Sequence, residues 1–392
     1  MKLHLKAFHL LRDFDNRLPF ESGGQVDLRR GFSGLEGALE KHLALKPRLR
    51  LHLQGGLSLE RQSDRRRRYD NLEGQRGPLA FDQTERFHSG ALFLLQQWQW
   101  GARWTLLASL RLDALRLQAS DHYLNDGDDS GRRSYTQLNP LLGLSFRPHP
   151  TLTLFADAAR SFETPALSEL SANPDGSGGF NPHLQPQTAL TLEGGLKFHP
   201  RKDLRTDLSL FLARVEGELV PFESADFPGR SFFQNAGRST RRGIEWSGYW
   251  RASPQLAAGW ALSYGRFVFE RFPTPEGDFA GKLLPGVPQV FGGAFLHFAP
   301  RKGSFLRAVV RWAGKTYADN ANAATADAFA RLDLRAGTTL RAGKLDLSFF
   351  GGLNNLTGSS YAGNVRINAF GGRFFEPAPR TNFYLGVRLG NR

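Results

Sequence analysis

The chain has 392 residues, with 51 Lys and Arg against 37 Asp and Glu, which gives a formal net charge of +14. No run approaches the ~18 apolar residues of a membrane-spanning helix, which excludes a helical membrane protein. Cysteine is absent, so disulfides and thiolate metal sites are excluded. The basic residues are scattered, without a basic helix, zinc-finger spacing or RNA-binding sheet motif, and nucleic acid is not an expected partner.

The N-terminal segment is predicted to be a strand. Residues 2–7 alternate between polar and apolar side chains. The segment lacks the long apolar core and the small-residue cleavage site of a secretory signal. Because an exported protein would carry such a signal, we expect this sequence to begin inside a longer protein.

Period-two alternation recurs along the chain. In residues 48–60, RLRLHLQGGLSLE, leucines occupy one face and polar side chains the other. Residues 203–219 and 331–340 repeat the pattern, and helical periodicity is nearly absent. In the closing segments, residues 345–350 and 383–389 also alternate. The sequence therefore predicts an all-β protein.

Short and long connections alternate between the expected strands, which predicts about 16 strands of ~9–15 residues. This arrangement is typical of an antiparallel transmembrane β-barrel, with short turns on the periplasmic side and long loops outside. Most short turns carry Lys or Arg, which favours a basic rim facing anionic phospholipid. The short connections are 44–48, 99–103, 147–151, 199–203, 251–255, 299–303 and 341–344. The long ones are 13–30, 64–81, 118–133, 163–187, 222–232, 271–285, 317–329 and 356–380.

Two pairs of residues mark special backbone positions. Gly237 and Gly243 flank the run RSTRR, where bulges or close backbone contacts are expected. Asn354 and Asn355 follow a strand, and asparagine tolerates the left-handed backbone conformation that a strand exit can require.

Several segments, taken together and in order, resemble the C-terminal barrel of TonB-dependent outer-membrane receptors, the importers of siderophores and iron complexes. The resemblance is close over residues 135–389 and looser before them. The segments are SFETPALSEL (161–170), NPHLQPQTALTLEGGLKF (181–198), NAGRSTRRGIEW (235–246), LLPGVPQ (283–289) and residues 347–389.

The resemblance implies a 22-stranded barrel in the outer membrane of a Gram-negative bacterium, filled by an N-terminal plug and energised by a TonB-type complex. This chain has about six strands fewer and no segment similar to the plug or to its TonB-contacting box. We therefore expect residues 1–392 to be one barrel domain without signal peptide, plug and first strands. It would reach the TonB-type complex only through a plug that the chain lacks.

The expected function is TonB-dependent uptake of iron–siderophore complexes or similar metal chelates. The alternative is a plugless, porin-like diffusion pore or a non-transporting outer-membrane fragment, because 16 strands can enclose an aqueous channel. HExxH, G-x-S-x-G and P-loop lysine motifs are absent, so neither an enzyme nor a cofactor is predicted. Outer-membrane lipid and lipopolysaccharide are expected partners. The ligand could be a chelate of iron or nickel, cobalamin or a carbohydrate.

Candidate ligand-binding residues lie in the expected outer loops. Guanidinium groups form bidentate bonds to carboxylates, as an anionic iron chelate would require, although lipopolysaccharide phosphate or solvent could equally occupy them. Phenylalanine rings of another loop could enclose the apolar part of a chelate or pack within the loop. The candidates are Arg65, Arg66, Arg67, Arg68, Tyr69, Phe222, Phe227, Phe232 and Phe233. The acidic run Asn125–Asp129 offers oxygen ligands for Ca²⁺ but is expected to be solvated, and no metal site is predicted.

Overall fold

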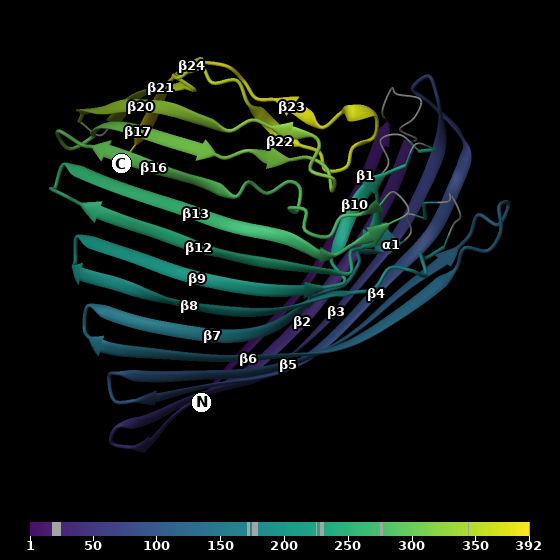
Figure 1. The fold of residues 1–392 in the computed structure, drawn as a ribbon, viewed down its shortest axis with the longest axis horizontal. Helices are drawn as coiled ribbons and strands as arrows, with labels where there is room; N and C mark the ends of the chain where they lie inside the picture. The colour runs from purple at the N-terminus through teal and green to yellow at the C-terminus, as the bar shows by residue number, and fades with distance from the viewer. Residues whose placement is uncertain are drawn as a thin grey trace.

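The computed structural model describes residues 1–17, 25–170, 173–174, 179–224, 226–227, 231–274, 277–343 and 345–391. One large curved sheet dominates the fold, and Figure 1 shows its strands following one another from the N-terminus to the C-terminus. It contains sixteen strands in chain order, with each paired strand antiparallel to its neighbour. The predicted all-β class and strand number are confirmed. Among the described helices, none is long and apolar enough to cross a membrane.

The strands of the large sheet are β1 (Lys2–Arg17), β2 (Gln25–Lys46), β3 (Leu49–Leu72), β4 (Gln75–Trp100), β5 (Trp104–Asp121), β6 (Gly131–His149), β7 (Leu152–Glu163), β8 (Gln187–Arg201), β9 (Leu204–Glu216), β12 (Arg238–Arg251), β13 (Leu256–Arg271), β16 (Val290–Phe298), β17 (Ser304–Ala313), β20 (Phe329–Ala342), β21 (Leu345–Asn354) and β24 (Asn382–Asn391).

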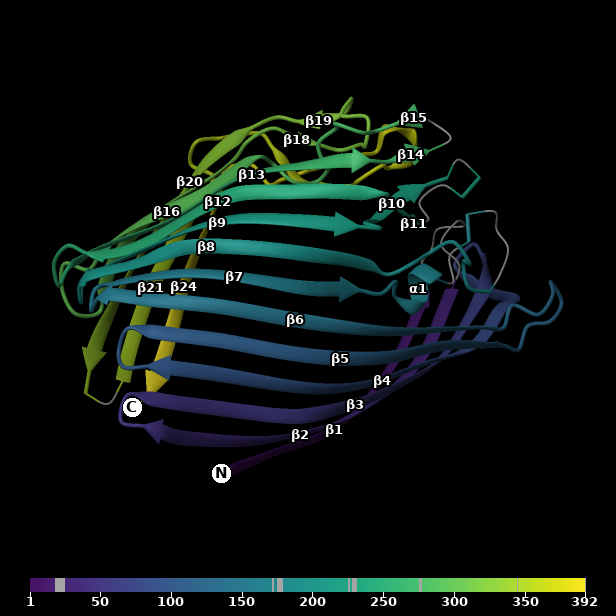
Figure 2. The same cartoon turned by 60° about the horizontal axis from the view of Figure 1, so that its bottom comes forward.

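Short turns gather at one end of the sheet, here called the turn end, and small hairpins and loops gather at the other, the loop end (Figure 2). Two buried apolar clusters lie among the loop-end elements, one around α1 and one around Phe269 and Phe272. The smaller elements are α1 (Leu167–Leu170), β10 (Leu219–Glu223), β11 (Ser231–Asn235), β14 (Pro273–Thr274), β15 (Gly277–Asp278), β18 (Thr316–Tyr317), β19 (Thr325–Ala326), β22 (Ala362–Val365), η2 (Phe370–Gly372) and β23 (Phe375–Pro377).

The two faces of the sheet differ in chemistry. Odd-numbered positions of β3 from Leu49 to Leu59 are apolar, and Leu59 is 51% exposed on the outer face. Even-numbered positions such as Gln62 and Arg66 line a cavity with residues 164–168 beside α1, so they face inward. The apolar outer segment has the length of ~9–11 residues that a tilted transmembrane strand needs.

Strands near the N-terminus are longer than predicted. β2, β3 and β4 have 22, 24 and 26 residues, whereas β16 has nine. Their loop-end halves are polar, which is why the sequence suggested loops at 13–30 and 64–81. These halves remain strands because their backbone groups and their charges are paired across the ladder.

The special backbone positions behave as predicted at three of the four residues. A Cβ on Gly243 would clash with the carbonyl oxygen of Tyr264 and lie 2.6 Å from the Phe211 ring. A Cβ on Gly237 would lie 2.8 Å from the Arg271 carbonyl oxygen, beside a register shift at Arg238. Asn355 has a φ of 51°, whereas Asn354 is absent from the described non-glycine residues with positive φ.

The sheet ends at β1 and β24. Among the described residues these two strands are the two ends of the strand order and do not pair with each other. On β24, Leu385 is 84% exposed, well above Leu59 on an interior strand. Both strands therefore present a free hydrogen-bonding edge.

Candidate ligand-binding and lipid-binding sites

The predicted arginine run lies in β3 and not in an outer loop, which corrects the sequence-based placement. Its residues pair in register with β2 and β4, from Arg65 opposite Arg29 and Thr84 to Arg68 opposite Val26 and Phe81. Alternation along the strand directs Arg66 and Arg68 inward and Arg65 and Arg67 outward. The four guanidinium groups therefore cannot all meet one chelate.

The inward side of this segment carries two ion pairs between neighbouring strands. Arg30 donates from Nε and Nη2 to the Asp64 carboxylate, over 2.9 and 2.6 Å. Arg66 Nη1 donates to Glu85 Oε1 over 2.7 Å. Both carboxylates are buried, and burial raises the pKa of Glu85 against the opposing effect of Arg66. Arg30, Arg66 and Glu85 line a cavity of about 560 Å³ between the sheet and the segment leading into α1.

Arg68 differs from the other arginines of the run. Within the described part of the chain, no carboxylate lies within ion-pairing distance of it, and its guanidinium lies over the Phe81 ring at 5.4 Å. Burial, and then the charge of Arg66, lower its pKa. The charges of Asp70 and Asp126 act on Arg68 more weakly and in the opposite direction. A partly desolvated guanidinium that forms no ion pair among the described residues has its charge available to an anionic ligand.

The outward residues of the run contact side chains of β4. Arg65 Nη2 and Arg67 Nε both contact Asp82 Oδ2, the latter at 3.5 Å. The Arg76 guanidinium lies 4.4 Å from the centre of the Tyr69 ring. These contacts hold the loop-end extension of the sheet together and lie away from the lumen.

The predicted aromatic residues are brought together, but largely by packing against each other. Phe232 is fully buried, and the rings of Phe222 and Phe227 each lie 5.8 Å from it. Phe233 packs instead against the cluster around α1. The alternative of loop packing therefore accounts for Phe232, while Phe222 and Phe227 are only partly buried.

Glu223 ties this aromatic hairpin to a distant loop. Its carboxylate accepts from Arg366 Nη2 and from the Phe370 backbone N–H, and Arg373 Nη2 lies 3.7 Å away. Asn368 Nδ2 adds a hydrogen bond of 2.8 Å to the Pro221 carbonyl oxygen. β10 and residues 366–370, which are far apart in sequence, are thus held side by side at the loop end of the sheet.

The acidic loop after β5 gathers three carboxylates, from Asp121, Asp126 and Asp129. Asp121 accepts backbone N–H groups of Tyr123 and Asp129 over 2.9 and 3.1 Å. Burial raises the pKa of Asp129, as does the neighbouring charge of Asp121. The Asp121 carboxylate, which belongs to β5, therefore hydrogen-bonds the backbone of the loop and fixes its conformation.

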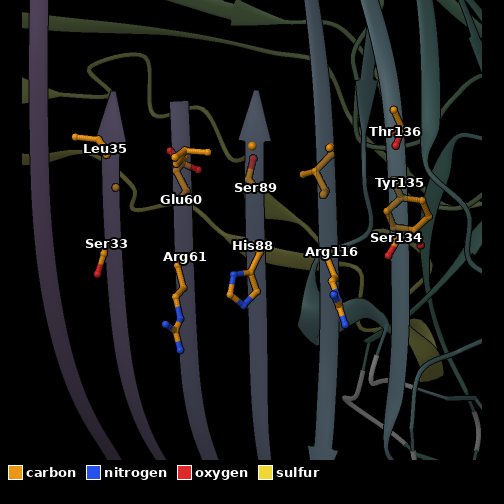
Figure 3. Close-up of a pocket in the computed structure, with 15 residues that line it drawn as sticks. Ser33, Leu35, Glu60, Arg61, His88, Ser89, Arg116, Ser134, Tyr135 and Thr136 are labelled. Carbon is orange, nitrogen blue, oxygen red and sulfur yellow. The ribbon is translucent and has the colours of Figure 1, made fainter. Parts of the chain in front are cut away.

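An outward-facing set of polar residues was missed by sequence reasoning. We call it the outer basic row. Figure 3 shows its members side by side on five adjacent strands, with Arg61, His88 and Arg116 pointing the same way. Each is paired in register with the next across the sheet. The row consists of Ser33, Arg61, His88, Arg116 and Ser134.

The outer basic row lies just beyond the apolar outer segment. It borders a cavity of about 690 Å³ whose lining also includes Leu35 and Leu59. In the described residues, no carboxylate lies within ion-pairing distance of Arg61 or Arg116. Burial, and then the charges of Arg61, Arg116 and Arg86, lower the pKa of His88. The signal that could have found the row is that Ser33, Arg61, His88 and Arg116 are each the first polar outward position after an apolar run, while on β6 the polar Thr136 comes just before Ser134.

Comparison with known proteins decides the family. A family model described as "TonB dependent receptor-like, beta-barrel" matches residues 8–356. The chain belongs to this family. The ferric citrate transporter FecA in its unliganded form has a similar fold, with a TM-score of 0.79 and 17% identity over 99% of this chain and 59% of FecA.

Two other solved structures share the fold. The copper transporter OprC has a TM-score of 0.75 and 17% identity, over 98% of this chain and 62% of OprC. The siderophore receptor PiuA from Acinetobacter baumannii has a TM-score of 0.74 and 15% identity, over 93% of this chain and 56% of PiuA. At these identities the likeness establishes the fold, and this chain spans about six-tenths of each receptor.

Proposed function

We propose that residues 1–392 form the barrel part of an outer-membrane receptor for TonB-dependent uptake of iron–siderophore complexes or similar metal chelates in a Gram-negative bacterium. The observation that carries this is the family match over residues 8–356. The chain's similarity to receptors named for ferric citrate, siderophores and copper supports a metal-complex ligand. It supports no enzymatic role. Coupling to a TonB-type complex would require a plug in addition to the barrel.

The proposed ligand site is the inward face of β2–β4 at the loop end. Arg68, which forms no ion pair among the described residues, supplies a guanidinium there, and the carboxylate-paired Arg30 and Arg66 line the cavity beside α1. Guanidinium groups bind carboxylates in a bidentate manner, so a carboxylate-bearing chelate is the ligand class we favour. The partly buried Phe222 and Phe227 are candidates for apolar contacts with it. Arg65, Arg67 and Tyr69 are assigned to the outer surface.

Chelate binding by the purified, folded chain tests this assignment. Arg68→Gln is expected to weaken binding of ferric citrate by about 10-fold or more, since a charge-assisted hydrogen bond contributes about 1.5–3 kcal/mol. Arg67→Gln is the matched control, because it removes a neighbouring arginine that faces outward. Equal affinities for the two variants would refute the role of Arg68. A neutral hydroxamate chelate should be insensitive to both substitutions.

The outer basic row supports a second partner, the phosphorylated headgroups of lipopolysaccharide in the outer leaflet. Cations immediately beyond an apolar band are placed where lipid phosphates lie, and Arg61 and Arg116 have no carboxylate partner among the described residues. Removing both with Arg61→Gln and Arg116→Gln should reduce the lipopolysaccharide that co-purifies with the chain. Replacing the carboxylate-paired Arg65 and Arg67 by glutamine provides the control. Unchanged retention in the first double variant would exclude this role.

The alternative, a freestanding diffusion pore, requires β1 to pair with β24. Among the described residues these strands are instead the two ends of the sheet. Single-channel conductance of the full chain in a planar bilayer separates the two functions. Large steady channels would support the pore, whereas chelate binding without steady conductance would support the receptor barrel.

A further inference from the structure

Four polar residues converge on the inner face of the sheet at the turn end, away from the proposed chelate site. His42 and His52 lie directly opposite each other in the β2–β3 hairpin. Glu40 precedes His42 by two positions and so shares its face, while the neighbouring outward positions Leu43 and Leu51 are apolar. His4 of β1 lies diagonally across from Glu40. Three strands thus contribute to one cluster.

The cluster centres on the Glu40 carboxylate. His42 Nε2 lies 2.6 Å from Glu40 Oε1, and His52 Nε2 lies 3.3 Å from the same oxygen. His4 Nε2 lies 3.1 Å from Glu40 Oε2. The His42 and His52 rings are stacked, with centroids 4.4 Å apart and planes 11° apart.

Hydrogen bonds among the described residues do not satisfy every polar atom of this cluster. His52 Nε2 is buried, yet within the described residues it has no hydrogen-bond partner, because its approach to Glu40 Oε1 lacks the required geometry. A buried nitrogen left unpaired costs about 1–3 kcal/mol. One carboxylate oxygen also receives two imidazole nitrogens. A cation with an open coordination shell would satisfy both nitrogens and the carboxylate together.

We propose that Glu40, His42 and His52 form a binding site for a divalent transition-metal ion on the inner wall of the barrel, with His4 within reach as a fourth ligand. Ligand atoms of Glu40, His42 and His52 lie within 4.8 Å of one another. Bonds of about 2.0–2.1 Å at tetrahedral angles separate ligand atoms by about 3.3 Å. The His52–Glu40 distance already has this value, and the shorter His42–Glu40 distance would lengthen on binding.

The ligand set selects the class of ion. Imidazole nitrogen with one carboxylate suits Zn²⁺, Cu²⁺ and Ni²⁺, whereas Ca²⁺ and Mg²⁺ prefer sites made wholly of oxygen. Three protein ligands leave a coordination position for water or for His4.

The test uses the full chain with an affinity tag free of histidine, stripped with EDTA and checked for folding by heat-modifiable migration. Calorimetric titration with Ni²⁺ should show one saturable site, and bound Cu²⁺ should show nitrogen hyperfine coupling in its paramagnetic resonance spectrum. His42→Asn and His52→Asn should each abolish this site, and Glu40→Gln should weaken it. His9→Asn is the control, because His9 lies on β1 but contacts Ser33 on the outer face.

A second measurement needs no variant that could fail to fold. In the unsubstituted chain, Zn²⁺ should protect the exposed His42 from diethyl pyrocarbonate while leaving His9 reactive, as read by mass spectrometry. If the folded chain binds no Ni²⁺, or if Zn²⁺ protects His42 and His9 equally, the site does not exist. Because the chelate site lies at the loop end, chelate binding by the same preparation would be unaffected by either result.

Discussion

Asp333 on β20 accepts the backbone N–H of Asn355 through Oδ1, over 2.9 Å. Its other oxygen accepts from Arg311 Nη1 over 2.8 Å. Asn355 has a φ of 51°. Its side-chain Nδ2 donates to the carbonyl oxygen of Ser359, and its Oδ1 accepts the Ser359 backbone N–H. A buried carboxylate and a left-handed asparagine together fix the exit of β21 against the sheet.

Asn355→Ala should lower the free energy of unfolding by about 2–4 kcal/mol, because hydrogen bonds are lost and alanine disfavours a positive φ. Temperature-dependent gel migration of the folded form would measure the loss. Asn354→Ala is the control, since the Asn354 side chain donates one exposed hydrogen bond to Asn382. Equal losses for the two variants would contradict the role of the left-handed turn.

Gly243→Ala is expected to destabilise the barrel by about 1–3 kcal/mol, the usual cost of forced overpacking. The new methyl group would meet the Tyr264 carbonyl oxygen and the Phe211 ring. Gly90→Ala should be well tolerated, because its Cβ would lie 3.5 Å from the end of the Leu59 side chain. Urea unfolding followed by tryptophan fluorescence compares the two. A harmless Gly243→Ala would show that β12 and β13 can separate at this point.

Glu223→Gln should loosen the link between β10 and the loop around η2 while leaving the barrel intact. The link depends on charge-assisted hydrogen bonds from Arg366 and on Asn368, which contacts the same hairpin. Hydrogen exchange of residues 219–223 and 366–370 should accelerate by about 10-fold or more, for a loss of about 1.5–3 kcal/mol. Glu376→Gln, an exposed change on β23, should leave both segments protected. Acceleration in that control as well would indicate a general charge effect.

The pKa of His88 should lie below the ordinary histidine value of 6.5, because burial and the nearby charges of Arg61, Arg116 and Arg86 disfavour the imidazolium. The sign follows from linkage. A histidine with a lowered folded-state pKa favours folding above pH 6.5, and this contribution is lost as the pH falls through the folded value. Arg61→Gln should raise the pKa, as measured by imidazole NMR, whereas Arg50→Gln should not. Bound lipid phosphate should raise it as well.

The alternation of apolar and polar residues along the sequence predicts most strands of the fold. This pattern predicts β3 correctly from Leu49 to Glu60, because apolar and polar side chains alternate there with the period of an extended strand. It fails from Arg65 onward, where the strand continues as a polar ladder. Strand pairing there depends on carboxylates of β4, such as Asp82 and Glu85, which no local pattern in β3 reveals.

The sites were harder to predict than the strands, because each depends on strand register. His42 and His52 lie ten positions apart, a spacing with no meaning on a single strand. They meet because a register shift between Ala44 and Lys46 in β2 brings His42 directly opposite His52 in β3. The outer basic row likewise takes its three basic side chains from three strands, and only the completed ladder places them level.

The two free edges of the sheet have complementary directions. Strands alternate in sense, so with an even number of them β1 and β24 run opposite ways. Any insertion of an even number of strands between these edges would preserve an antiparallel closure, whereas an odd number would force one parallel seam. In a bilayer, where an unpaired backbone group costs several kcal/mol, both edges need to be covered, and added hairpins cover them while every pairing stays antiparallel. The ring can be enlarged in steps of two strands without altering the register of any existing pair.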